Sequence, residues 1–323
     1  MRRADHGARP PMMRMIVLGS AAGGGFPQWN CACANCKRAW AGDPAAPSRT
    51  QSSLAISADG VRWLLLNASP DLRQQILQTP ALYPSADAGQ RDSSIAAVVI
   101  TNGDVDHLGG LINLREGWPF GLYAHDRLHA ALDANPVFGV LNPQIVARRP
   151  LPLETRTPIA DGAGRHIGLT LETFAVPGKV PLYQEGSRRG GDYAGAAGDT
   201  LAVQLIEPGS DARVYYVPNC AKLDAATAER LTGADLVFFD GTLYRDDEMI
   251  QAGLSEKTGR RMGHMPVDGP GGSLEALAGL GIARSVYLHV NNSNPILCAD
   301  TPERAKVESA GWSVAIDGLE LTA

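Results

Sequence analysis

The residues best suited to chemistry gather directly after one apolar stretch of the chain. Residues 95–100 read Ile-Ala-Ala-Val-Val-Ile, a run typical of a buried β-strand. Asn102, Asp104, Asp106 and His107 follow within six residues, beginning at an Asn-Gly turn. Open α/β sheets place their sites at the carboxyl ends of strands, so this cluster predicts a site at such an edge. A solvated acidic turn is the simpler alternative.

The cysteines suggest a second centre. Of the five cysteines, Cys31, Cys33 and Cys36 are clustered, whereas Cys220 and Cys298 are isolated. An odd number with tight clustering favours metal binding over a disulfide framework. Three thiolates so close in sequence can converge on one soft cation, and zinc is the expected occupant. Buried cysteines without a metal are the alternative, and the spacing does not identify a fourth ligand.

The composition is that of an ordinary globular protein. The chain has 323 residues, of which 44% are hydrophobic, and a net charge of −5 without a basic stripe, which argues against a nucleic-acid partner. No apolar run reaches the length of a membrane span, and residues 1–14 lack the apolar core of a signal peptide. We therefore expect a cytoplasmic protein with a disordered N-terminal extension, 1–14, and a single domain, 15–323.

Short apolar strands recur along the chain, separated by turns and short helices. Strands are expected at 15–20, 52–57, 63–67, 95–100, 121–124, 167–176, 201–206, 213–217, 234–240 and 285–289, and a strand pair is expected within 312–321. Helices are expected at 72–78 with Ser69 as N-cap, at 108–114, at 126–134, from an Asp224 cap to Leu231, and at 273–280. Each half reads as an antiparallel meander followed by β/α units, which predicts an α/β fold arranged as a four-layer αββα sandwich.

Three later strands also end in polar residues. Asn219, Asp240 and His289 each follow or end an apolar run, so they are expected at the same kind of sheet edge as the first cluster. His125 and His129 lie four residues apart at the start of an expected helix. This spacing suits a metal pair, but we interpret both as surface or capping residues.

Several motifs resemble a known superfamily. The Thr-x-x-x-x-Asp-His pattern that ends at His107 resembles the metallo-β-lactamase motif, whose usual form is His-x-His-x-Asp-His. The opening Gly-Ser-Ala-Ala-Gly-Gly, the Cys-x-Cys-x-x-Cys cluster and the closing Ala-Ile-Asp-Gly-Leu-Glu-Leu resemble its phosphodiesterase branch. Within that branch, the chain from about Met15 onward is similar to the B proteins of pyrroloquinoline quinone (PQQ) biosynthesis. This similarity rests on residues 19–33, 239–249, 262–265 and 289–295.

The chain departs from the superfamily pattern at one of the two metal sites. Asn102 and Asp104 stand where the hydrolases have histidines, the later histidine is replaced near residues 177–178, and the usual bridging aspartate falls on Asn219. The resemblance therefore implies that the first metal site is lost.

The second metal site keeps its pattern. Asp106, His107 and His289 still occupy their positions by the resemblance. Two histidines and one carboxylate form the facial triad of non-haem Fe(II) proteins, whereas hydrolysis in this fold generally needs two metals. We therefore expect one Fe(II) ion at these three residues.

The resemblance also implies an activity. The family is associated with oxidising the tyrosine ring of a cross-linked Glu-Tyr intermediate on the way to PQQ, which suggests an iron-dependent oxygenase. One alternative is a metal-dependent hydrolase with Asp104 and Asn219 as substitute ligands. Another is a soluble carrier in the transport or release of PQQ or its precursor. The expected ligand is a small-molecule PQQ precursor, with other PQQ biosynthesis proteins or a second copy of the chain as candidate partners.

Supporting roles follow from the same resemblance. His264 stands where the phosphodiesterase branch has its catalytic histidine, and we expect it to act as general acid or base or to orient the substrate phenol. Asp240 is expected to brace the same edge, and Asp104 and Asn219 to orient imidazoles or to bind the metal weakly. Asn292 replaces a histidine that is the fourth zinc ligand in that branch, so water or a nearby carboxylate is the candidate substitute.

One polar loop remains. Residues 187–198 are rich in glycine and carry the adjacent Arg188 and Arg189, which suggests a mobile loop or lid. The two arginines are candidates to pair with the carboxylates of a Glu-Tyr-derived substrate, and a solvated loop is the alternative.

Overall fold

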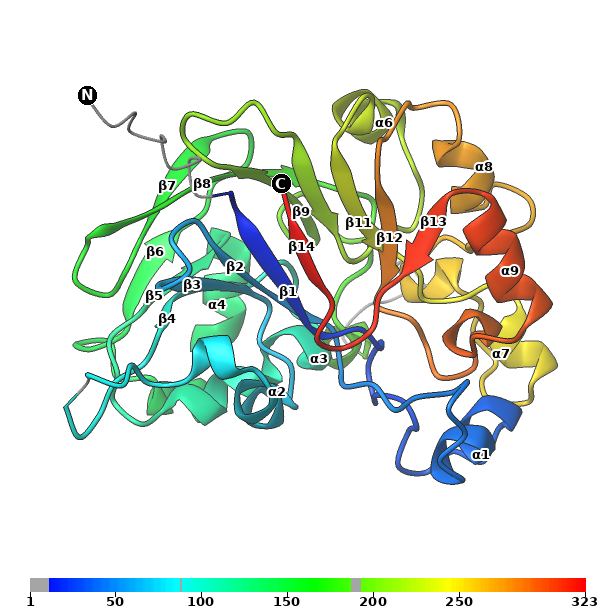
Figure 1. Cartoon of the computed structure of the whole chain (residues 1–323), viewed down its shortest axis with the longest axis horizontal. Helices are drawn as coiled ribbons and strands as arrows, with labels where there is room; N and C mark the ends of the chain where they lie inside the picture. Colours follow the sequence, from blue (N-terminus) through cyan, green and yellow to red (C-terminus); the bar gives the residue numbers. More distant parts are fainter. Residues whose placement is uncertain (1–11, 88, 187–192) are drawn as a thin grey trace, which may run out of the picture.

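The computed structural model describes residues 12–87, 89–186 and 193–323. Within them, two seven-stranded sheets face each other (Figure 1). The first sheet has the order β14-β1-β2-β3-β4-β5-β6, and the second has the order β13-β12-β11-β10-β9-β8-β7. The strands of the first are β1 Arg14–Gly19, β2 Ser53–Ser57, β3 Trp63–Leu66, β4 Ile95–Val99, β5 Gly121–Ala124, β6 Ala147–Pro150 and β14 Glu320–Thr322. Those of the second are β7 Arg156–Ala160, β8 His166–Ala175, β9 Leu201–Ile206, β10 Val214–Val217, β11 Leu236–Asp240, β12 Ser285–Leu288 and β13 Trp312–Val314.

The two sheets repeat one pairing scheme. In the first, the pairs from β14 to β3 are antiparallel and those from β3 to β6 are parallel. In the second, the pairs from β7 to β10 are antiparallel and those from β10 to β13 are parallel. The predicted repeat of a meander followed by β/α units is therefore confirmed.

The strand pair expected within 312–321 is wrong. β13 pairs with β12 in the second sheet, whereas β14 pairs with β1 in the first. The chain crosses between the sheets at Asp317, whose carboxylate accepts hydrogen bonds from the backbone N–H and hydroxyl groups of both Ser20 and Thr50. These bonds fix the crossover and separate the last two strands.

Helices lie on the outer faces of both sheets and in the loops at the sheet edges. They are α1 Ala34–Trp40, α2 Leu72–Gln78, α3 Val105–Leu108, α4 Asp126–Asp133, α5 Leu182–Glu185, α6 Ala225–Leu231, α7 Glu248–Gln251, α8 Ser273–Leu277 and α9 Pro302–Ser309. Short 3₁₀ segments are η1 Pro80–Leu82, η2 Gly109–Leu114, η3 Pro136–Val140, η4 Arg260–Met262 and η5 Pro295–Leu297. The helix expected at 108–114 is thus mostly 3₁₀. The N-cap of α2 is Asp71 rather than Ser69, since Ser69 still lies in the extended turn after β3.

Alternating side chains build three hydrophobic layers. In β1, Met15 and Val17 face the second sheet, whereas Ile16 and Leu18 pack with α2 and α4. In β11 the residues of the central layer alternate with residues that pack against α6, α8 and α9. Figure 1 shows α2 and α4 on one outer side and α6, α8 and α9 on the other. The four-layer αββα sandwich of the metallo-β-lactamase fold is therefore confirmed.

The start of the described chain lies close to the expected boundary. Met13 is buried and Arg14 begins β1, so the first strand starts just before residue 15, while residues 1–11 lie outside the described residues. Arg188 and Arg189 also lie outside them. Across the described parts of the chain, no helix combines the length and apolar character needed to cross a bilayer.

Candidate metal centre

The turn between β4 and α3 positions the first ligand-type side chains. Asp104 is the N-cap of α3, and its backbone carbonyl accepts the N–H of His107 at 3.0 Å. Asp106 and His107 are therefore held on one helical turn directly beyond the strand. The small-residue loop after β1 covers Asp106, because a Cβ added to Gly23 would lie 3.3 Å from Asp106 Oδ2. A larger residue at that position would crowd the carboxylate.

His289 reaches the same point from the second sheet. It follows β12 and has a φ of 57°, a left-handed conformation that is uncommon for a residue other than glycine. Its Nε2 lies 3.0 Å from Asp106 Oδ2, and His107 Nε2 lies 3.9 Å from the same oxygen. One ligand atom from each of these three residues lies within 4.8 Å of the others. Ligands about 2.1 Å from a common ion have such separations.

The chemistry of His107 fits a metal ligand. Its side chain is completely buried, and neither ring nitrogen has a hydrogen-bond partner among the described residues. An unpaired buried polar group costs about 1–3 kcal/mol, which a coordinated cation would offset. Burial lowers the pKa of His107 to about 4, so the ring is neutral near pH 7 and can coordinate. Although burial opposes it, the neighbouring His107 and His289 imidazoles, including the hydrogen bond to His289, hold the pKa of Asp106 below its usual range.

A buried threonine links His289 to a second polar group. Thr242 Oγ1 lies 2.8 Å from His289 Nδ1, 3.1 Å from His264 Nδ1 and 2.6 Å from Asp240 Oδ1. The same hydroxyl lies 2.9 Å from the carbonyl oxygen of His289. Asp240 Oδ2 also lies 2.7 Å from His264 Nδ1. Thr242 and Asp240 thus fix the Nδ1 side of both imidazoles and leave their Nε2 atoms for other partners.

Asp240 is better suited to bracing than to coordination. Asp240, His264 and His289 form a second group whose ligand atoms lie within 4.8 Å of one another. However, the Asp240 carboxylate already accepts the N–H groups of Cys220 and Thr242 and the Thr242 hydroxyl. Although burial opposes it, the nearby His264 holds the pKa of Asp240 below its usual range. The carboxylate is therefore an anion with its oxygens occupied.

Amide groups meet where the superfamily pattern has its other metal ligands. Asn102 Nδ2 donates to Asn219 Oδ1 at 2.6 Å, and both residues are buried. Asp104 turns toward Lys179, whose Nζ lies 3.6 Å from Asp104 Oδ1. Asp104 and Asn219 line the same pocket as His264 and His289, but neither belongs to the three-residue metal groups among the described residues.

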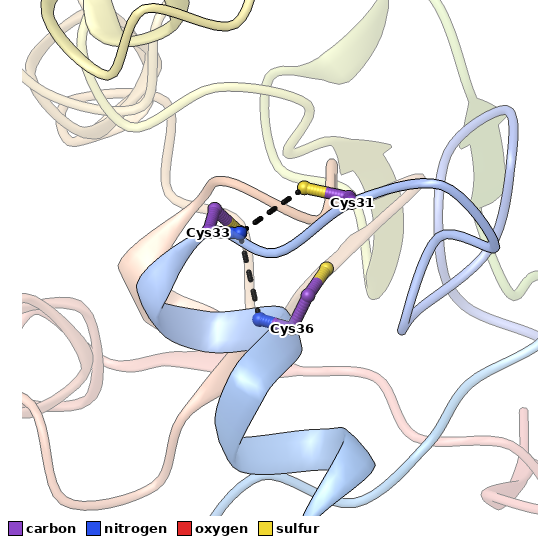
Figure 2. A group of neighbouring side chains, drawn as sticks. All are labelled: Cys31, Cys33 and Cys36. Carbon is purple, nitrogen blue, oxygen red and sulfur yellow. Dashed lines mark hydrogen bonds between the residues drawn. The ribbon is translucent and has the colours of Figure 1, made fainter.

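Three of the five cysteines, Cys31, Cys33 and Cys36, lie together at the start of α1 (Figure 2). Cys33 is the N-cap of α1 and its sulfur accepts the N–H of Cys36, while Cys31 Sγ accepts the N–H of Cys33. The three sulfurs lie within 4.8 Å of one another. Burial raises the pKa of Cys36 to about 12, so a protein environment alone does not produce three thiolates. A bound cation would stabilise the thiolate form of all three cysteines, and three sulfur ligands suit zinc.

Asn292 stands beside all three sulfurs. Its Nδ2 lies 3.1 Å from Cys31 Sγ, 3.8 Å from Cys33 Sγ and 3.3 Å from Cys36 Sγ. The oxygen and nitrogen of an amide are interchangeable by a 180° turn, so Oδ1 can occupy this position when a cation is bound. The side chain at the expected fourth-ligand position therefore reaches the cluster.

The remaining sequence interpretations have clear outcomes. His125 is the N-cap of α4, where its Nδ1 accepts the N–H of Arg127, and His129 Nε2 lies 2.9 Å from the Arg149 carbonyl. Capping was therefore the right interpretation for His125. Cys220 and Cys298 are buried free thiols outside the cysteine cluster.

Two residues of the site escaped the sequence analysis. Thr242 lies within the Phe-Asp-Gly-Thr segment after β11, but its contacts to two histidines depend on tertiary structure. Lys179 follows the Pro-Gly pair after β8 and lines the pocket. The sequence signal that could have identified Lys179 is a lysine directly after residues 177–178, where the superfamily has its later histidine.

Comparisons with known proteins agree with this geometry. The beta-lactamase superfamily domain matches residues 62–290. Coenzyme PQQ synthesis protein B from Xanthomonas oryzae pv. oryzae is 52% identical over 309 residues, covering 96% of this chain and 99% of that protein. The protein of the same name from Gluconacetobacter diazotrophicus is 51% identical over 311 residues, covering 96% of this chain and all of that protein.

Solved structures show the same relationship. Zn²⁺-bound PqqB from Methylobacterium extorquens has a TM-score of 0.89 and 47% identity, covering 95% of this chain and 99% of that chain. A diphosphatase of the PhnP family has a TM-score of 0.68 at 20% identity, covering 96% of this chain and 97% of that chain, and this likeness shows the fold alone. The near-complete matches at about half identity show that the chain belongs to the coenzyme PQQ synthesis protein B family of the beta-lactamase superfamily.

Proposed function

We propose that this chain acts in PQQ biosynthesis as a mononuclear non-haem Fe(II) oxygenase that hydroxylates the tyrosine ring of a Glu-Tyr-derived precursor. The names of its relatives support the pathway. The observation that carries the chemistry is the convergence of Asp106, His107 and His289, with both ring nitrogens of His107 buried and unpaired. Iron bound by two imidazoles and one carboxylate supplies oxygen activation and leaves positions open for substrate.

The chain's own residues hold the substrate and move its protons. Asp240 and Thr242 fix the Nδ1 side of His264, so its Nε2 is the atom that binds the phenol hydroxyl and exchanges its proton. In the overall reaction one oxygen atom of O₂ enters the ring and the other leaves as water. Two protons and two electrons complete the balance, and the electrons come from an external small-molecule reductant.

The pocket also favours this reaction over hydrolysis. Phosphodiester hydrolysis in this fold uses two metal ions about 3.5–4 Å apart to hold the attacking and leaving oxygens. The side chains of Asn102 and Asn219 are hydrogen-bonded to each other, and the Asp104 carboxylate forms an ion pair with Lys179. At these superfamily positions a second ion therefore has no imidazole ligand.

Metal analysis and oxygen uptake test this proposal. Protein purified without air is loaded with Fe(II), desalted and mixed with a tyrosine-containing precursor and ascorbate in an oxygen electrode. We expect about one iron per chain at the histidine centre, with zinc retained at the cysteines. Oxygen consumption should match formation of the hydroxylated ring, measured by mass spectrometry.

The other outcomes separate the alternatives. Turnover of a phosphodiester under argon would favour a hydrolase. Precursor or PQQ binding without oxygen uptake, with unchanged binding after His107→Ala, would favour a carrier. Zinc at the histidine centre with no activity after iron loading would contradict the oxygenase.

A further inference from the structure

A group of charged side chains lies at the pocket that contains His264 and His289. Glu185, at the end of α5, lies 3.5 Å from Lys179 Nζ, 3.2 Å from Lys257 Nζ and 2.9 Å from Arg261. Arg261 makes two contacts with this carboxylate, and its guanidinium lies 3.4 Å above the ring centre of Tyr193. The arginine is therefore held in place from two sides, and it keeps Glu185 where it is.

The charges in this group do not balance. Lys179, Lys257 and Arg261 face two carboxylates, Asp104 and Glu185, which leaves one excess positive charge. Hydrogen bonding from Arg261, with help from the lysines, lowers the pKa of Glu185 to about 2, so Glu185 is an anion at neutral pH. Arg261 engages Glu185 through two nitrogens, and Lys179 is shared between Asp104 and Glu185. The excess charge belongs to the cluster as a whole, within which Lys257 contacts Glu185 alone, at 3.2 Å.

Lys257 is also the accessible member of the group. Its side chain is 37% exposed, compared with 15% for Lys179, and both line the pocket that contains His264 and His289. This pocket has a volume of about 340 Å³. Leu182, Met249 and Met262 form apolar parts of the same wall. A ligand that fits has an apolar, ring-like body and carries a carboxylate that reaches Lys257.

We propose that Lys257, supported by Lys179, binds a substrate carboxylate and so selects aromatic substrates with several carboxylates. This inference rests on the proposed function for the identity of the reacting ring, but the subsite itself depends only on charge and shape. Glu185 acts as a positioning residue because it contacts both ammonium groups. Arg261 acts through Glu185, which it holds in place.

Binding of PQQ, an aromatic tricarboxylate, tests the subsite without any turnover. Isothermal titration compares metal-loaded wild type with Lys257→Met, which keeps the length of the stem and removes the charge. We expect the Kd to rise roughly five- to tenfold, because the lysine is partly exposed and its ion pair is partly screened. Lys257→Arg should keep the affinity within about threefold, since the charge remains.

Two controls make the result specific. Lys306→Met removes the same charge from α9, where Lys306 pairs with Asp268 outside this pocket, and it should leave the Kd unchanged. The trimethyl ester of PQQ should bind wild type and Lys257→Met equally, because it has no anionic carboxylate. Thermal melting of each variant checks the fold.

The outcomes distinguish this inference from the proposed reaction. Oxygen uptake with equal PQQ affinity in wild type and Lys257→Met overturns the subsite and leaves the oxygenase standing. Affinity that depends on Lys257 without any oxygen uptake supports the subsite and overturns the oxygenase. Absence of measurable PQQ binding to the wild type also overturns the subsite.

Discussion

Two sides of one pocket have different chemistry. The retained side consists of Asp106, His107 and His289, whose ligand atoms converge within 4.8 Å. The converted side consists of Asn102, Asn219, Asp104 and Lys179, which satisfy one another through an amide–amide hydrogen bond and an ion pair. On the retained side, the two ring nitrogens of His107 are buried without a hydrogen-bond partner among the described residues, which favours a bound cation. On the converted side, the polar side chains pair with one another. This difference agrees with the proposed single metal site beside a cationic wall.

The sharpest test of the retained side is His107→Ala. Loss of one of three protein ligands should lower iron affinity by more than about 100-fold, a larger effect than the loss of an outer partner, and abolish oxygen uptake. Metal content by mass spectrometry and an oxygen electrode measure both. His166→Ala, an exposed histidine on β8, is the matched control and should keep full iron content. Full iron content in His107→Ala would contradict the assignment of His107 as a metal ligand.

Thr242→Val tests the support of the retained side and should have a smaller effect. The substitution keeps the shape but removes the hydroxyl that contacts the His289 ring and the His289 carbonyl. We expect iron affinity to fall about tenfold, as for other residues that orient metal ligands. Competition with an Fe(II) chelator measures it. Thr232→Val, at the end of α6, removes a comparable hydroxyl outside the site and should have no effect on affinity.

Asn219→Ala tests the converted side and should change metal binding least. We expect iron affinity to change less than about threefold, because Asn219 bonds to Asn102 rather than to the metal group. The melting temperature should fall, since the buried Asn102 amide loses its partner at a cost of about 1–3 kcal/mol. Asn102→Ala combined with Asn219→Ala should lose little more stability than Asn219→Ala alone. A large loss of iron would make Asn219 a ligand and favour the two-metal alternative.

Local sequence patterns predicted most of the fold. Apolar runs identified β4, β11 and β12 almost to the residue, and the predicted αββα sandwich follows from their repeat in two halves. The terminal strand pair was wrong because pairing depends on Asp317, which binds two residues distant in sequence. The prediction that Ser69 caps the helix was wrong, because α2 begins after Asp71 and the Ser69 hydroxyl has no hydrogen-bond partner among the described residues.

The sequence by itself determined which chemistry the site can have. The spacing of the cysteine triplet predicts a metal site, and the family resemblance identifies residues 106, 107 and 289 as a ligand set. By the same resemblance, asparagine replaces a histidine at 102 and the bridging aspartate at 219. Only the tertiary structure decided that Thr242 contacts two histidines, that Asn292 reaches the three sulfurs and that Lys257 lies in a cluster of charged side chains at the pocket. Hydrogen bonds and ion pairs act over about 3–4 Å, so they depend on how distant segments pack and are not encoded in local spacing.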